Sequence, residues 1–466
     1  MVTGEVFERF LAESPICVME RVLLENIFAP DKLDKVFRSA AVRQYERELL
    51  FSTLVELTSF VVCRKHPSVH AAFKKHRERI PVSLKALYDK LSQVEGTTAR
   101  ALVQHTALAA GQVIDRMKGG LPPLLPGYQV RILDGNHLSG TEHRLKVLRG
   151  TSAGALPGQA LVMLDPQRMV IADVFPCEDG HAQERSLLGQ VLPTIRARDL
   201  IIDDRNFCTL GFLAGLVRRR AYFITRQHAR MPWESQGKKR YIGRCATGRL
   251  FEQAAVLIDP ETKREIVVRR ITLQLDKPTR DGDPEIHLLT NLPASKVNAK
   301  RVAKLYQKRW RLETAFQELT VHLRCELNTL GYPPAALFAF CVALSCYNLL
   351  AAIQAALRRA HGTQTIEESL SHFYLTEEIS GVHRGMMIAI PPREWEAFQT
   401  MSCADLANLL VRWARGVDLE NYRKHPRAPK KPRAQRPNAQ FQHVATAKLL
   451  PAKRHITRNQ RPEADP

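Results

Sequence analysis

The sequence predicts an α/β protein, and three observations support that prediction. Residues 1 to about 120 have apolar positions at helical spacing, for example in residues 41–63 and 99–117. From Tyr128 the pattern changes to short alternating or continuous apolar runs, which are typical of strands. Helices then return in the last third of the chain, after the long uncharged stretch of residues 335–357. This order indicates a mixed fold that begins with a helical region.

Composition restricts the class of partner and the compartment. Lysine plus arginine is 69 and aspartate plus glutamate is 47, which gives a formal net charge of +22 and a pI near 9.8. Such a charge favours a polyanion, either nucleic acid or an anionic membrane surface. The nine cysteines form no CxxC pair, so we expect free thiols in a reducing cytoplasm rather than a zinc ribbon or a disulfide framework. The first eighteen residues lack the features of a signal peptide.

The N-terminal helical region carries a basic cluster whose role the sequence leaves open. A solvated basic face and a DNA contact both fit the charge pattern. The interleaved histidines have no cysteine or carboxylate at metal-binding spacing, so a metal site is not indicated. Residues 119–127, with three prolines, are a predicted linker. The cluster comprises Arg64, Lys65, His66, His70, Lys74, Lys75, His76, Arg77 and Arg79.

Two of the predicted strands end in carboxylates. The first strand ends in Asp134, before the turn residues Gly135 and Asn136, and a later strand ends in Asp203 and Asp204. Burying a carboxylate is costly unless a metal or a cation compensates it. Adjacent strand residues point to opposite faces, so only one of the two aspartates can face a shared site. The predicted elements are strands 129–134, 159–165, 169–175, 200–204 and 221–225, with helices 183–192 and 207–217.

Residues 304–324 are predicted to form one amphipathic helix. Tyr306, Arg309 and Glu313 share a polar stripe because they lie at i, i+3 and i+7. Alone, this pattern also fits a surface helix with an Arg–Glu pair. Together with the two strand ends, however, Glu313 completes a three-carboxylate site suited to two Mg²⁺ ions and phosphodiester chemistry. The second, apolar stripe comprises Leu305, Leu312, Phe316, Leu319 and Leu323.

Three motifs together resemble the DDE transposases of the insertion-sequence-four family. They are Leu133-Asp134-Gly135-Asn136, Asp204-Arg205-Asn206-Phe207 and Tyr306-x2-Arg309-x3-Glu313. The resemblance spans roughly residues 128–450 and implies that Asp134, Asp204 and Glu313 bind two Mg²⁺ or Mn²⁺ ions. It implies that Tyr306 and Arg309 hold the backbone of the transposon-end DNA. It also selects Asp204 over Asp203, which is expected to cap or to pair with an arginine.

The resemblance implies an RNase H-like catalytic core, in which the first and fourth strands are neighbours, with a β-rich insertion before the last catalytic residue. This sequence departs from the family at Thr320, where the family signature has a lysine, so a charged contact with phosphate is missing. Arg324, on the same predicted helical stripe as Tyr306, is our hypothesis for the replacement cation.

The predicted insertion carries basic candidates for DNA contact, namely Lys238, Lys239 and Arg240. It also carries Trp233, which by family analogy would stack on a flipped base, although a tryptophan is more often a packing residue. After the predicted insertion, residues 335–357 fit either a membrane span or, as we favour, a core helix, for which Pro333 and Pro334 suit the start.

The predicted division of the chain has six parts. Residues 1–120 are a helical DNA-binding domain, 128–225 and 297–360 are two parts of the catalytic core, and 226–296 are the β-rich insertion. Residues 361–420 are helical, and 421–466 are a basic tail, with eleven lysines and arginines and no acidic residue between 421 and 460.

The expected function is cut-and-paste transposition by a bacterial cytoplasmic, nucleoid-associated enzyme. Double-stranded DNA would be the substrate, no membrane would be involved, and a dimer would pair the two inverted-repeat ends. Two other readings stay open: an RNase H-like nuclease or resolvase, and a domesticated DNA-binding protein without activity.

Overall fold

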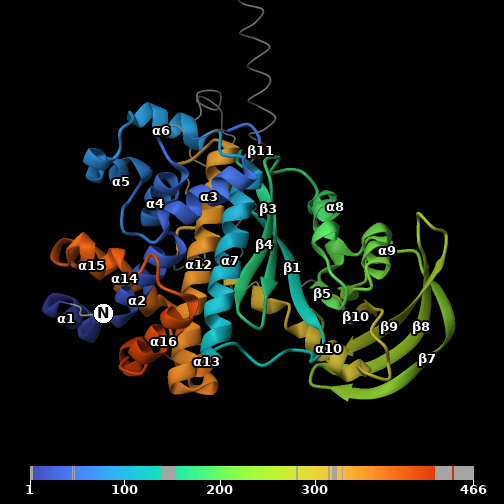
Figure 1. Ribbon diagram of the computed structural model, residues 1–466. Helices are drawn as coiled ribbons and strands as arrows, with labels where there is room; N and C mark the ends of the chain where they lie inside the picture. Colours follow the sequence, from blue (N-terminus) through green and yellow to red (C-terminus); the bar gives the residue numbers. More distant parts are fainter. Residues whose placement is uncertain are drawn as a thin grey trace, which may run out of the picture.

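The computed structural model describes residues 4–44, 46, 48–138, 154–279, 282–312, 315–316, 323–327, 329–425 and 443–445. A nine-stranded sheet has helices from both ends of the chain on one face, and short helices cover part of its other face (Figure 1). The fold is therefore mixed α/β, as the sequence predicts. A separate two-stranded parallel sheet joins β2 (Gly154–Leu156) to β11 (His443–Ala445).

The large sheet has strands of both orientations. Strands β1, β5 and β6 are parallel, and all other neighbours are antiparallel. The prediction that the first strand and the strand of residues 200–204 are neighbours is confirmed, because β1 pairs with β5. The strand order is β4 (Val170–Cys177), β3 (Gln159–Asp165), β1 (Gln129–His137), β5 (Asp199–Asp203), β6 (Tyr222–Arg226), β10 (Glu285–Thr290), β9 (Glu265–Leu275), β8 (Gly248–Ile258) and β7 (Glu234–Cys245).

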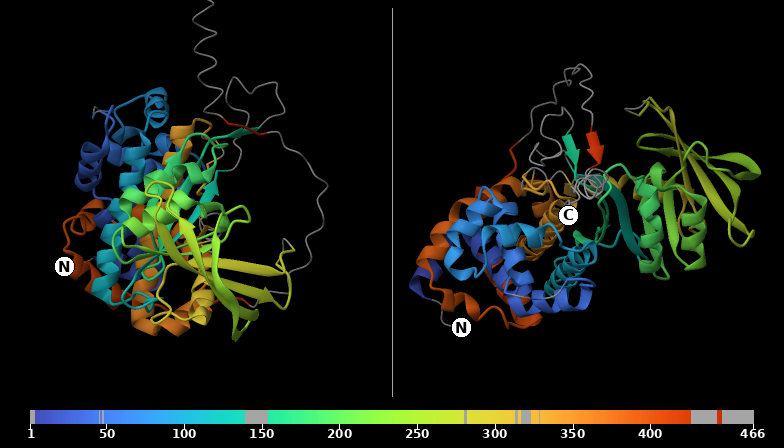
Figure 2. Two further views of the ribbon diagram at one scale, coloured as in Figure 1. Left: turned by 90° about the vertical axis from the view of Figure 1, so that its right-hand side faces the viewer. Right: turned by 90° about the horizontal axis from the view of Figure 1, so that it is seen from above.

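Helices from the two ends of the chain form one layer on one face of the sheet. Phe7 near the N-terminus packs on Trp395, Phe398 and Trp413, with ring centroids 5.1 to 6.1 Å apart. Figures 1 and 2 show these helices together on one side, with strands β7–β9 extending away on the other. The N-terminal helices are α1 (Glu5–Glu13), α2 (Pro15–Ile27), α3 (Pro30–Ala40), α4 (Phe51–Val62), α5 (Val69–Lys75), α6 (Leu84–Leu91) and α7 (Gly96–Met117).

The C-terminal helices pack on α2 and α7, so a single main core runs from α1 to the end of the helical region. The region of residues 1 to 120 is helical as predicted, but its division from the rest into separate domains stays a prediction. These C-terminal elements are α12 (Pro333–His361), α13 (Thr363–Ser369), α14 (His372–Ala389), α15 (Pro392–Glu396), α16 (Cys403–Ala414) and the 3₁₀ turn η6 (Leu419–Tyr422).

Helix α12 is the central helix of this layer and packs against α7 and β4 (Figure 1). It is long and apolar enough to cross a membrane, but its most apolar window is entirely buried inside the protein. This burial confirms the prediction of a core helix. The linker reaches α12 very closely at Gly119, where a Cβ atom would lie 2.2 Å from the Ala355 carbonyl oxygen. Only glycine fits there.

A second core lies on the opposite face of the sheet, under the short helices. It joins sheet residues such as Leu133 and Ile201 to Leu213 and Leu216 of α9 (Leu210–Arg218). Helix α8 (Leu188–Val191) contributes Leu188 and Val191. The predicted helices of residues 183–192 and 207–217 are thus present as shorter elements, preceded by the 3₁₀ turns η3 (Glu184–Leu187) and η5 (Arg205–Phe207).

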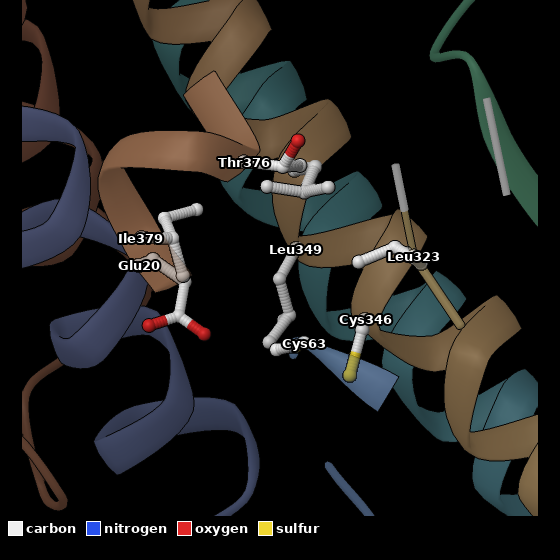
Figure 3. A pocket seen from close by; sticks show the side chains of 8 residues that line it. Glu20, Cys63, Leu323, Cys346, Leu349, Thr376 and Ile379 are labelled. Atoms are coloured by element: carbon white, nitrogen blue, oxygen red, sulfur yellow. The ribbon is translucent and has the colours of Figure 1, made fainter. Parts of the chain in front are cut away.

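Part of the N-terminal basic cluster is buried and unavailable to a partner. Lys65 Nζ lies 2.9 and 3.0 Å from the two carboxylate oxygens of Glu20, and both side chains are almost completely buried. Beside this ion pair is a small cavity of about 10 Å³, between α2, α12, α14 and the end of α4 (Figure 3). That volume holds about one water molecule. Its lining comprises Glu20, Cys63, Leu323, Cys346, Leu349, Leu350, Thr376 and Ile379.

Asn348 of α12 forms hydrogen bonds with β4, an edge strand of the sheet. Its buried amide accepts a hydrogen bond from the Ile171 N–H at 2.7 Å and donates to the Ile171 carbonyl at 3.1 Å. It also donates to the Thr106 hydroxyl of α7 at 3.2 Å. One side chain therefore joins β4, α7 and α12.

We predict that Asn348→Leu, which nearly conserves volume, lowers the free energy of unfolding by about 2 to 4 kcal/mol, because it leaves two buried backbone groups of Ile171 unpaired. Ser345→Ala is the control, since the Ser345 hydroxyl donates only to Cys341 of its own helix, at 2.9 Å. Its effect should stay under about 1 kcal/mol. Urea denaturation measures both. An Asn348→Leu protein as stable as the wild type would contradict the assignment.

Candidate functional site

Strand pairing brings the two predicted carboxylates to the same end of neighbouring strands. Ile132 of β1 is in register with Ile202 of β5, and Asp134 and Asp204 each lie two residues further on. Because side chains alternate along a strand, each aspartate points to the same face as the isoleucine two residues before it. Both isoleucines belong to the main core, so Asp134 and Asp204 face the helical layer.

The third motif contacts both carboxylates. Helix α10 (Ala299–Gln307) follows the insertion, and its Tyr306 hydroxyl donates to Asp204 Oδ1 at 3.2 Å. Arg309 Nη1 lies 2.9 Å from Asp134 Oδ2, and both side chains are less than one-fifth exposed. The structure therefore brings together Asp134, Asp204 and the Tyr306–Arg309 pair, which come from three segments that are far apart in the sequence.

The backbone after α10 explains why Tyr306 and Arg309 act side by side. Helix α10 ends at Gln307, and the chain tightens into i to i+3 hydrogen bonds from Lys308 to Leu305 and from Arg309 to Tyr306. In a turn of this kind, side chains three residues apart are eclipsed. Tyr306 and Arg309 are thereby aligned above the two aspartates.

Burial raises the pKa of the Tyr306 phenol further above physiological pH. The pKa of its phenol is raised well above the usual value, mainly because the side chain is removed from water and secondly because Asp204 is nearby. A protonated phenol is a hydrogen-bond donor at physiological pH, which agrees with its contact to Asp204.

Asp203 behaves differently from the expectation that it caps or pairs with an arginine. It is completely buried, and neither of its oxygens has a hydrogen-bond partner of regular geometry among the described residues. Burial raises its pKa well above the usual value, although the neighbouring Thr225 hydroxyl opposes that shift. Asp203 points to the face of the second core, opposite to Asp204. The choice of Asp204 as the residue that faces the site agrees with this geometry.

The single helix predicted over residues 304–324 is wrong in its extent. Residues 323–327 are not helical, and the Arg324 N–H donates to the Val62 carbonyl at 2.8 Å. Arg324 Nη1 donates to the Pro67 carbonyl at 3.0 Å. Arg324 therefore does not lie on a helical stripe with Tyr306, and the argument that placed it there fails. Its contact with DNA stays a prediction. Glu313 and Thr320 lie outside the described residues.

The segment predicted to be an insertion, residues 226–296, contains strands β7 to β10, of which β7 is the exposed edge of the sheet. Lys238, Lys239 and Arg240 all lie on β7 and are exposed. Lys239 Nζ lies 3.8 Å from Glu285 and 4.6 Å from the centre of the Phe251 ring. The sequence did not predict β7, because a strand exposed on both faces has no apolar alternation.

Trp233 is partly buried beside the second core, as a packing residue would be. The Arg270 guanidinium lies 4.5 Å from the centre of its ring. A stacked cation covers one face of an aromatic ring. Stacking of Trp233 on a base would therefore use the other face or displace Arg270.

Glu184 is a residue near this site whose role the sequence did not indicate. Its carboxylate lies against Gly135, Asn206 and His137, in or beside the first two motifs. No local pattern predicts these contacts, because they join residues 22 to 49 positions apart.

The carboxylate oxygens of Asp134 and Asp204 are chemically suited to bind a hard divalent cation. Carboxylate oxygens are the ligands that Mg²⁺ prefers, and Asp134 and Asp204 face the same side at adjacent strand ends. Within the described residues, no group of three or more His, Cys, Asp or Glu side chains is arranged to hold a metal ion. The predicted third ligand, Glu313, is outside that part of the chain.

Comparison with known proteins points to one class. Residues 125–349 match the model of a protein family described as "Transposase DDE domain". This segment contains all three motifs. The chain is also 30% identical over 128 residues to a protein of Sinorhizobium fredii (strain NBRC 101917 / NGR234) named "Putative transposase y4zB". That alignment covers 26% of this chain and 33% of the relative, so the chain spans about a third of the relative's length. Both findings support a transposase with a DDE domain.

We predict that Arg309→Gln binds Mn²⁺ about 3- to 10-fold more tightly than the wild type in the absence of DNA. The reason is that the Arg309 guanidinium competes with a divalent cation for Asp134, and about 1 kcal/mol corresponds to about a fivefold change. Arg311→Gln is the matched control, because the Arg311 guanidinium donates to the Pro166 carbonyl at 3.0 Å instead. Electron paramagnetic resonance of free Mn²⁺ measures the affinity. Unchanged or weaker binding in Arg309→Gln would refute the competition.

Proposed function

We propose that this protein is a DNA transposase that excises and inserts a DNA segment by a cut-and-paste route. The observation that carries the proposal is the meeting of three distant motifs: Tyr306 contacts Asp204 and Arg309 contacts Asp134. The match of residues 125–349 to a transposase DDE domain supports it. The likeness to the insertion-sequence-four family rests on the motifs alone and is part of this proposal.

The catalytic core is proposed to be RNase H-like. Strands β4, β3, β1, β5 and β6 are adjacent in that order, with β1, β5 and β6 parallel. Helices cover both faces of this part of the sheet (Figure 1). The β-rich insertion follows β6 and precedes α10, which agrees with an insertion before the last catalytic residue.

In the proposed reaction, Asp134, Asp204 and Glu313 hold two Mg²⁺ ions, or Mn²⁺ ions in their place. When bound, these ions lower the pKa of the attacking water and stabilise the leaving oxygen of the phosphodiester. Tyr306 and Arg309 bind the backbone phosphate of the transposon end, since a protonated phenol and a guanidinium both donate to phosphate oxygens. No general-base or nucleophilic side chain is required.

The DNA is proposed to lie over several basic regions as well. These are the exposed residues of β7, the basic tail, the helical N-terminal region, and the segment that contains Thr320 and Arg324. Trp233 is retained as the candidate for base stacking. Two copies of the protein would be needed to hold both inverted-repeat ends, so a dimer forms part of the proposal.

The alternative of a DNA-binding protein without activity has one observation in its favour. Thr320 stands where the family signature has a lysine, so one charged contact to DNA is lost. Excision activity separates the two functions.

We predict that Asp134→Asn, Asp204→Asn and Glu313→Gln each lower plasmid excision by at least about 10³-fold. Each nearly isosteric change removes one charged metal ligand, metal stabilisation is worth several kcal/mol, and about 1.4 kcal/mol changes a rate tenfold. Excision is measured in Mg²⁺ with the DNA that flanks this gene as ends, and gel shift measures end binding. Asp276→Asn is the control, since Asp276 forms an exposed pair with Arg244.

Wild-type excision together with mutants that bind but do not cut supports the proposal. Binding without excision by the wild type would establish the inactive alternative. Cutting without preference for inverted repeats would instead indicate a nuclease or resolvase.

We also predict that replacing Lys238, Lys239 and Arg240 by glutamine weakens DNA binding and its salt dependence. Each phosphate contact contributes about 0.9 to the slope of log K against log salt concentration, so the slope should fall by up to about 3. Glutamines at Lys263, Arg264 and Lys277, also in the insertion but outside β7, provide the matched triple control. Fluorescence anisotropy at several salt concentrations measures the slope. An unchanged slope would exclude contact between these three side chains of β7 and the DNA phosphates.

A further inference from the structure

Glu184 occupies a fixed place between the two carboxylate-bearing strand ends. It is the first residue of η3, which follows β4 and leads into α8. Leu187, at the end of η3, is buried in the second core with Leu188 and Val191 of α8. The turn also packs against β3 and η5. The backbone that carries Glu184 is therefore anchored, and the side chain is only 17% exposed.

One end of the Glu184 carboxylate lies against the first motif. A Cβ atom at Gly135 would be 2.0 Å from Glu184 Oε1 and 2.4 Å from its Cδ, so a side chain at position 135 would displace the carboxylate. Glu184 Oε1 is also 3.6 Å from His137 Nδ1, further along β1. Gly135 directly follows Asp134. The absence of a side chain at this position lets Glu184 approach the backbone next to that aspartate.

The other oxygen of the same carboxylate contacts the second motif. Asn206 Nδ2 donates a hydrogen bond to Glu184 Oε2. Asn206 lies in η5, two residues after Asp204. Glu184 thus spans from the residue after Asp134 to the turn after Asp204, and neither motif contains it.

We propose that Glu184 is a positioning residue, which holds the end of β1 and the turn after β5 in the relation that the two aspartates need. This inference rests on the proposed function. Asp134 and Asp204 repel each other when both are ionised, and β1 and β5 share no backbone pairing beyond Ile132 and Ile202. Pairing with β3 continues along β1 as far as His137, but it does not hold the turn after β5. Glu184 links that turn to the end of β1 through Asn206 and the contact with Gly135. Misplacement of a reacting group by about 1 Å costs about 100-fold in rate.

The test compares Glu184→Ala with Glu184→Gln, because glutamine keeps an oxygen that can accept from Asn206. Glu178→Ala is the matched control: an exposed glutamate in the same connection between β4 and η3. We expect Glu184→Ala to cut transposon ends about 10- to 100-fold more slowly, as is typical when a residue that supports a metal ligand is lost. End binding should change less than about twofold, and Glu184→Gln should regain most of the rate.

A double-mutant cycle tests whether Glu184 acts through Asn206. If it does, Glu184→Ala with Asn206→Ala should be no slower than the slower single variant. Gly135→Ala should give the same defect by displacing the carboxylate. Additive losses would overturn the mechanism. A Glu184→Gln protein as slow as Glu184→Ala, with a raised Mg²⁺ requirement, would show that Glu184 is a metal ligand and not a positioning residue.

Hydrogen exchange measures the positioning without any activity. Amides in residues 133–138 and 204–208 should exchange at least about 10-fold faster in Glu184→Ala than in the wild type, Glu184→Gln or Glu178→Ala. Equal exchange in all four proteins would overturn the proposal, whether or not the protein cuts DNA. If exchange is faster in Glu184→Ala but the wild type shows no excision, the positioning role stands and the proposed function is refuted.

Discussion

The candidate site depends on the parallel pairing of β1 with β5. Their register places Asp134 and Asp204 at neighbouring strand ends on one face, so two half-buried carboxylates lie at adjacent strand ends. Such a pair is costly unless cations or hydrogen-bond donors compensate it. In this structure a guanidinium contacts one aspartate and a protonated phenol contacts the other. The sheet brings the two negative charges together, and Tyr306 and Arg309 at the end of α10 stabilise them.

The helical layer determines where that segment can lie. Helix α12 is buried along its length, and Asn348 joins it to β4 and α7. Helices from both ends of the chain share the main core with β1, β5 and α10. The helical regions therefore support the sheet directly. A change that loosens the contact between α7 and α12 would alter the positions of the ends of β1 and β5.

Much of this arrangement follows from local pattern, and the remainder depends on contacts between distant residues. Residues 159–165 were predicted with the observed bounds of β3, because their apolar run ends at turn residues. Strand β7 was missed because an edge strand exposed on both faces has no alternation. The single helix predicted over residues 304–324 is interrupted at Lys308 and Arg309 and does not extend to residues 323–327, although residues 310–312 are helical again. Apolar spacing alone does not separate a continuous α-helix from one with a tighter turn. Glu184 could not be found, because its partners are defined only by the folded sheet.

The position of Arg309 links the two binding events that the proposed function requires. The same guanidinium contacts Asp134 in the free protein and is proposed to bind a DNA phosphate in the complex. When it moves to phosphate, Asp134 loses a cation and gains affinity for a metal ion. Linkage is reciprocal, so metal binding must favour the DNA-bound position of Arg309 by the same free energy. Under the proposed function, the metal site would then be completed mainly when DNA is bound.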